Sequence, residues 1–157
     1  MLNEINIKRV RQDAEEFFSS DSFGCSEAVI LSVRKNIDPN MPIALVYAGA
    51  GFPGGVGGSR CMCGSVSGAV VCLGYFFGRT TPTTITDPKS QKCLNLAHEL
   101  QESFKKKHKG VMCCHVHTRG MDMGSGEHKA QCSAFVGEMA EKAAEIVVRE
   151  LGLRLEA

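Results

Sequence analysis

Residues 49–78 read GAGFPGGVGGSRCMCGSVSGAVVCLGYFFG, a stretch in which glycine and cysteine are concentrated. A glycine-rich turn leads to Cys63, and the small and apolar residues after it predict a helix from there to about Phe77. Gly64 and Gly68 lie one turn apart in that helix, and each costs about 1 kcal/mol in helix propensity. We therefore expect a neighbouring helix to approach this face closely, with Cys63 at the start of the packed segment.

The glycines of this stretch match a nucleotide-binding pattern only by letter. Residues 49–54 read GAGFPG, which satisfies G-x-G-x-x-G. A dinucleotide site also needs a helix that opens at the third glycine and an acidic residue about 20 positions later. Here more glycine follows, the next acidic residue is Asp87, and no Gly-Lys-Ser/Thr sequence completes a phosphate loop. The stretch is therefore interpreted as a tight turn that packs beside something bulky.

The sequence on both sides of this stretch predicts amphipathic helices. Ile5, Val10 and Phe17, for example, form an apolar stripe on a segment that is otherwise charged. The expected helices span residues 3–19, 25–36, 63–77, 90–108 and 129–151, with a short apolar segment at 43–50. This pattern predicts an all-α fold in which residues 1–157 form a single domain. We expect a compact bundle of about five to six helices with a glycine-rich turn.

The composition of the chain argues against several classes of function. The 157 residues carry a formal net charge of +1, which provides no general attraction to nucleic acid or to an anionic membrane. Residues 1–18 lack the apolar segment of a secretory signal. Two uncharged spans, 39–59 and 61–78, contain too much glycine, proline and serine for a stable membrane span. We therefore expect a cytoplasmic protein, in which eight cysteines favour metal binding or redox chemistry.

Four cysteines are the candidate site residues. Cys25, Cys63 and Cys132 each fall at a predicted helix start, and Cys114 or Cys113 lies in a loop before a helix. The free N–H groups and the dipole at a helix start lower a thiol pKa and stabilise anionic sulfur. Four thiolates that converge from separate helices would form a soft site for an iron–sulfur cluster or for zinc.

The other side chains that could bind a metal are interpreted as core or surface residues. Cys72 and Cys93 lie in apolar helical patterns and are predicted to be small core residues. His115 and His117 could bind a metal, but we favour exposed loop positions for both.

Several segments together resemble a known family of redox-active proteins that is defined by a C…CGAxxG…C…C pattern. Residues 63–69, CGSVSGA, are similar to the central motif, with Ser65 in place of its alanine. The other similar segments are Gly24–Val29, the glycine-rich turn Gly51–Gly57, Gly78–Thr80, Cys132–Val136 and Ala143–Ile146.

The resemblance implies a small, all-helical, cytoplasmic redox protein centred on four cysteines. These cysteines correspond to Cys25, Cys63, Cys114 and Cys132 in this chain. A related domain occurs in certain multihaem cytochromes, alongside an iron–sulfur centre. This chain departs from the pattern by also carrying Cys61 and Cys113 beside two of the expected cysteines. Three roles therefore stay open for these extra cysteines: a shifted ligand set, a fifth thiol at the site, or a resolving cysteine.

Three hypotheses follow for the function. The leading one is a redox-active protein whose four cysteines ligate an iron–sulfur cluster or another metal for electron transfer. The second is metal-free thiol–disulfide chemistry, with Cys61/Cys63 or Cys113/Cys114 as partners. The third is a structural zinc site in a helical binding module. Whether the chain is an oxidoreductase or a carrier is left open, as are its redox partner protein and the formation of a homodimer.

Overall fold

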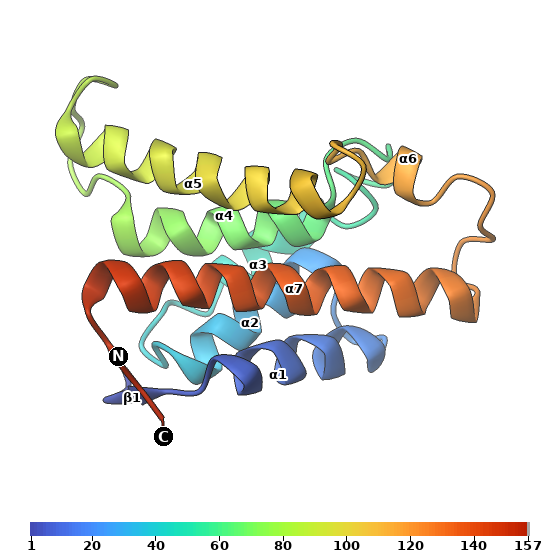
Figure 1. Ribbon diagram of the computed structural model, residues 1–157, viewed down its shortest axis with the longest axis horizontal. Coiled ribbons are helices and arrows are strands. Elements are labelled where there is room, and N and C mark those ends of the chain that lie inside the picture. Colours follow the sequence, from blue (N-terminus) through green and yellow to red (C-terminus); the bar gives the residue numbers. More distant parts are fainter. Residues whose placement is uncertain (157) are drawn as a thin grey trace.

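The computed structural model describes residues 1–156, which form α-helices and one short pair of parallel strands (Figure 1). In chain order the elements are β1 (Glu4–Ile5), α1 (Ile7–Ser19), α2 (Cys25–Asn36), α3 (Ala44–Ala48), the 3₁₀ helix η1 (Gly49–Gly51), α4 (Gly64–Phe77), α5 (Pro88–Lys107), α6 (Cys114–His117), α7 (Gly126–Leu151) and β2 (Arg154–Leu155). The predicted all-α bundle is confirmed. Its five long helices lie where the sequence patterns place them, and α3 and α6 are short additions.

Helix α7 is the centre of the bundle. It packs against α1, α2, α4 and α5, and in Figure 1 it runs between the α4–α5 pair and the α1–α2 pair. Its buried side chains include Val136, Met139, Ala143 and Val147, none of which is exposed to solvent. Each Å² of apolar surface that is buried stabilises the fold by about 25 cal/mol. Because α7 buries apolar surface on several sides, it holds the other long helices together.

Helices α2 and α4 meet at Gly68, as the glycine spacing predicts. A Cβ at this position would lie 2.6 Å from the carbonyl oxygen of Ser26 and 2.8 Å from its Cα. A side chain would therefore push the two helices apart. The same close approach brings the first turn of α4 against α2, where Gly64 contacts the sulfur of Cys25.

The starts of α1 and α7 differ from the sequence prediction. Residues 4 and 5 do not begin α1 but pair in parallel with Arg154 and Leu155. The reason is Asn6, whose side chain accepts a hydrogen bond from the Arg9 N–H and so sets the start of α1 at residue 7. Helix α7 also begins earlier than predicted, at Gly126, because the Ser125 hydroxyl accepts a hydrogen bond from the His128 N–H.

None of the helices described within residues 1–156 combines the length and apolar character needed to cross a membrane. Helix α4, the most apolar of the five long helices, has 14 residues, whereas a membrane-spanning helix needs about 20.

Candidate functional site

Four cysteines from separate segments line one cavity of about 160 Å³. Cys25 is the first residue of α2, Cys63 is the N-cap of α4, and Cys114 is the first residue of α6. Cys132 lies in the second turn of α7, so its predicted place in a first turn is wrong, because α7 begins at Gly126. The structure thus brings together all four cysteines that the sequence singled out.

The glycine-rich turn carries the chain around this cavity. Gly54 and Gly55 line it, with φ angles of 69° and 73° that favour glycine. A Cβ on Gly55 would lie 2.6 Å from the Cys61 nitrogen, and the Cys61 N–H donates to the Gly55 carbonyl at 2.9 Å. The glycines therefore fold the loop tightly back on itself just before Cys63.

A short antiparallel pairing places Cys114 on the cavity and turns Cys113 away from it. Met62 faces Cys113 in an isolated bridge, and the Cys114 N–H donates to the Cys61 carbonyl at 2.6 Å. The Cys113 sulfur donates to the Arg60 carbonyl at 3.2 Å. Cys61 is exposed. Of the two neighbouring pairs, only Cys63 and Cys114 contribute to the cavity lining.

For Cys25 and Cys132, the predicted lowering of the thiol pKa is wrong. Burial, together with the charge of Cys63, raises the pKa of Cys25 to about 11 and that of Cys132 to about 12. The same two causes raise the pKa of Cys114. Loss of water and repulsion between neighbouring sulfurs outweigh the stabilisation that a helix start gives a thiolate. Cys63 is a cause of the raised pKa in each of the other three cysteines.

Hydrogen-bond donors surround three of the sulfurs. The backbone N–H groups of Gly54 and Ser26 lower the pKa of Cys25, in opposition to burial. The Cys63 sulfur lies 3.1 Å from the Ser65 hydroxyl oxygen. The Cys132 sulfur lies 3.6 Å from Nε2 of His128. Such donors stabilise anionic sulfur in either a free thiolate or a metal ligand.

His128 is the cavity residue that the sequence reasoning missed. Its Nδ1 accepts a hydrogen bond from the Gly124 N–H at 3.2 Å, so in the neutral ring Nε2 carries the proton that faces Cys132. The pattern His-x-x-x-Cys on one helix face could have identified it, since residues four apart lie side by side. His115 is exposed, as predicted, but it lies in α6 and not in a loop. His117 is instead half-buried, and its ring packs against both Phe104 and Phe135.

The rest of the cavity wall consists of apolar side chains and of backbone. Phe18, Pro53 and Met123 complete the lining together with glycines. The volume is below the roughly 300–1,000 Å³ of typical small-molecule sites. Within residues 1–156, no three His, Cys, Asp or Glu side chains group closely enough to hold a single metal ion. The donor set is therefore sulfur-rich and arranged around a small space, without converging on one point.

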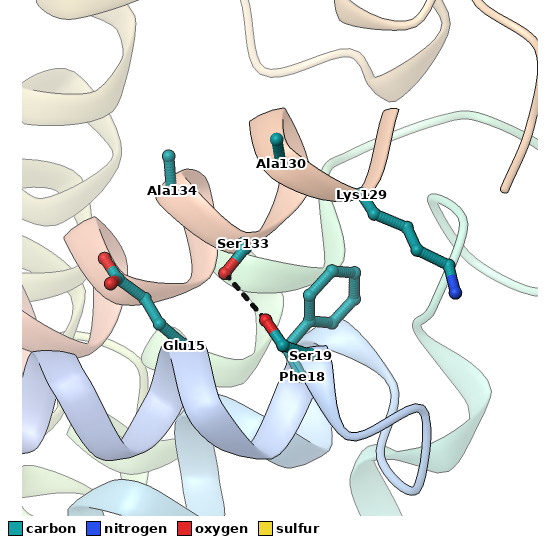
Figure 2. Close-up of a pocket in the computed structure, with 7 residues that line it drawn as sticks. All are labelled: Glu15, Phe18, Ser19, Lys129, Ala130, Ser133 and Ala134. Atoms are coloured by element: carbon teal, nitrogen blue, oxygen red, sulfur yellow. Dashed lines mark hydrogen bonds between the residues drawn. The ribbon is translucent and has the colours of Figure 1, made fainter. Parts of the chain in front are cut away.

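A larger hollow lies next to this cavity but has a different character. Figure 2 shows it between α1 and α7, where the hydroxyls of Ser19 and Ser133 lie 3.3 Å apart. It contains no cysteine, and Lys129 at its edge is paired with Asp21 at 2.8 Å. Phe18 lines both spaces and so forms part of the wall between them.

Comparison with known proteins identifies the family. A family model described as "Putative redox-active protein (C_GCAxxG_C_C)" matches residues 23–146, a range that includes all four cavity cysteines. No curated protein and no solved structure gives a significant match. The chain belongs to the C_GCAxxG_C_C family of redox-active proteins.

Proposed function

We propose that this protein is a small electron-transfer protein whose cavity cysteines, Cys25, Cys63, Cys114 and Cys132, hold an iron–sulfur cluster. The observation that carries the proposal is the meeting of four thiols from four separate segments at one cavity. When bound, a cluster of this kind supplies one-electron redox chemistry. The helices hold the sulfurs, and the apolar walls limit the access of water to them.

Electrostatics support a cationic occupant. Each of Cys25, Cys114 and Cys132 has its pKa raised by burial and by the charge of Cys63. Four thiolates at this cavity repel one another, and among the described residues Arg60 is the cation that lowers the pKa of one of them, Cys114. Iron ions would supply the missing positive charge, and their binding would release the thiol protons.

The arrangement and burial of the donors favour a cluster over the other two hypotheses. The cysteines do not converge on one point, as a tetrahedral zinc site requires. Thiol–disulfide exchange works best with an exposed thiol whose pKa lies near the ambient pH. Of the suggested disulfide partners, Cys61 and Cys113 do not line the cavity, and burial raises the pKa of Cys114 above its ordinary value.

The test is anaerobic purification followed by iron and sulfide analysis. We expect wild-type protein, as isolated or after reconstitution, to contain both elements and to absorb in the visible region. Cys132→Ser should lose most of the iron. Cys93→Ser should retain it, because Cys93 is equally half-buried but lies on α5 outside the cavity.

Wild-type protein that takes up neither iron nor sulfide would refute the cluster. An equal loss of iron in the two variants would also contradict the assignment, since it would separate iron content from the cavity. Zinc at one per chain, together with unfolding on chelation, would support the structural zinc site instead.

A further inference from the structure

We propose that Ser65 is a positioning residue for the redox site, whose hydroxyl donates a hydrogen bond to the Cys63 sulfur and raises the reduction potential of the bound group. This inference rests on the proposed function, because the potential belongs to the group that the cysteines hold. The observation behind it is the 3.1 Å distance between Ser65 Oγ and Cys63 Sγ.

The hydroxyl of Ser65 has the Cys63 sulfur as its hydrogen-bond partner. Ser65 is 0 % exposed, so water cannot satisfy it, and buried hydroxyls are almost always hydrogen-bonded. A helical serine often donates to the carbonyl four residues earlier. For Ser65 that carbonyl is Cys61, which accepts from the Cys114 N–H at 2.6 Å, whereas the Ser65 hydroxyl lies within hydrogen-bond distance of the Cys63 sulfur instead. Cys63 is the one side-chain partner that the described part of the chain provides for Ser65.

The direction of the bond follows from the chemistry of the sulfur. A thiolate or a metal-bound cysteine has no proton, so only the serine can donate. A hydrogen bond to anionic sulfur is charge-assisted and stronger than a neutral one. It stabilises the reduced state more than the oxidised state, since reduction adds negative charge that the sulfurs share. Loss of the hydroxyl should therefore lower the potential.

Ser67 is a matched control in the same helical turn. It is 3 % exposed, and its hydroxyl oxygen lies 3.4 Å from the Cys63 carbonyl, not from the sulfur. Removal of either hydroxyl makes a small change in the buried part of α4. Only the change at Ser65 removes a donor from a cavity sulfur.

The experiment compares Ser65→Ala, Ser67→Ala and Ser65→Thr with wild type at equal iron content. We expect Ser65→Ala to shift the midpoint potential to a more negative value. Ser67→Ala should leave the potential unchanged, and Ser65→Thr, which keeps a hydroxyl, should return it towards wild type. Equal potentials in Ser65→Ala and wild type would overturn the proposal, as would equal shifts in both alanine variants.

A second measurement separates this inference from the proposed function. If wild-type protein binds no iron, the cluster fails, and the Ser65 bond is then tested on the metal-free protein. Iodoacetamide should modify Cys63 several-fold more slowly in Ser65→Ala than in wild type or Ser67→Ala, because the thiolate loses its donor. Unchanged or faster modification in Ser65→Ala would refute the bond itself.

Discussion

The cysteines of this chain occupy very different surroundings. Cys72 has no exposed surface, and burial raises the pKa of its thiol. Cys61 is exposed next to the cavity but does not line it. Thiolate formation and access together set the reactivity of a cysteine. Cys61 therefore shows that a cysteine two positions from a candidate site residue need not line the cavity.

We predict that iodoacetamide modifies Cys61 first and Cys72 last in the folded, metal-free protein. Exposure favours Cys61, whereas burial hinders both access to Cys72 and the ionisation of its thiol. Mass spectrometry of peptides over a time course would measure the order. In denaturant all eight cysteines should react at similar rates. Early modification of Cys72 in the folded protein would show that α4 is not packed as described.

The positions of two candidate cysteines could be predicted from the sequence where local rules applied. The starts of α2 and α4 were visible in the pattern, so Cys25 and Cys63 could be placed at helix ends. The choice between Cys113 and Cys114 depends on the pairing of residues 60–63 with 112–115, a contact between segments far apart in the chain. The raised pKa values also depend on tertiary burial, and for this reason a rule about helix ends predicted the wrong direction.

Among the elements, the α2–α4 contact decides how closely Cys25 and Cys63 approach each other. The contact depends on glycine at position 68, where a Cβ would lie within 3 Å of the Ser26 backbone. Backbone atoms cannot move aside as a flexible side chain does. The glycine therefore fixes the distance between two helices that each present a sulfur to the cavity.

We predict that Gly68→Ala destabilises the fold by about 1–3 kcal/mol, since the methyl group overfills the helix contact. Gly74→Ala in the same helix is the control, because nothing lies within 4 Å of a Cβ at that position. It should be neutral or stabilising by up to about 1 kcal/mol through helix propensity. Urea unfolding followed by circular dichroism would measure both. Equal stability of the two variants would contradict the close contact.

The elements themselves were largely predictable. Apolar periodicity and turn residues locate the five long helices to within a few residues, because these are local properties of the chain. The pairing of β1 with β2 was not predictable, since it joins residues 4–5 to 154–155. Two-residue strands have no periodicity of their own, and their partner lies at the other end of the chain.

At the scale of the whole molecule, ion pairs join α5 to α7. Glu99 on α5 accepts two hydrogen bonds from Arg149 on α7, at 2.9 and 2.7 Å. Lys142 on α7 also pairs with Glu99 at 3.1 Å. The hydrogen bonds from Arg149, followed by those from Lys142, lower the pKa of Glu99 to about 2 from its ordinary value of 4.5.

We predict that this network stabilises the protein at neutral pH and fails in acid. A lowered pKa in the folded state gives stability that is present above pH 4.5 and is lost as the pH falls towards 2. The difference in unfolding free energy between wild type and Glu99→Gln should therefore shrink over that range. Because the Glu99 side chain is 36 % exposed, we expect about 1 kcal/mol or less at pH 7.

Urea unfolding at pH 7, 5 and 3 at constant ionic strength would measure this dependence. Glu16→Gln is the control, because Glu16 is exposed and no ion pair of it is present among residues 1–156. The difference in unfolding free energy between Glu16→Gln and wild type should vary less with pH than the difference between Glu99→Gln and wild type. A difference for Glu99→Gln that stays constant from pH 7 to pH 3 would contradict the network.

The pairing of β1 with β2 also has a practical meaning for electrochemistry. Both strands lie at the end of the bundle opposite α6 and the start of α7 (Figure 1). A linker attached beside either strand would fix the molecule to an electrode by the end remote from the sulfurs. The cavity would then face the solution, where a diffusing redox partner could reach it. Attachment near α6 would reverse the orientation and place the sulfurs next to the electrode. For a cavity that holds the proposed cluster, comparison of the two immobilised forms would separate electron exchange with the electrode from electron exchange with a partner.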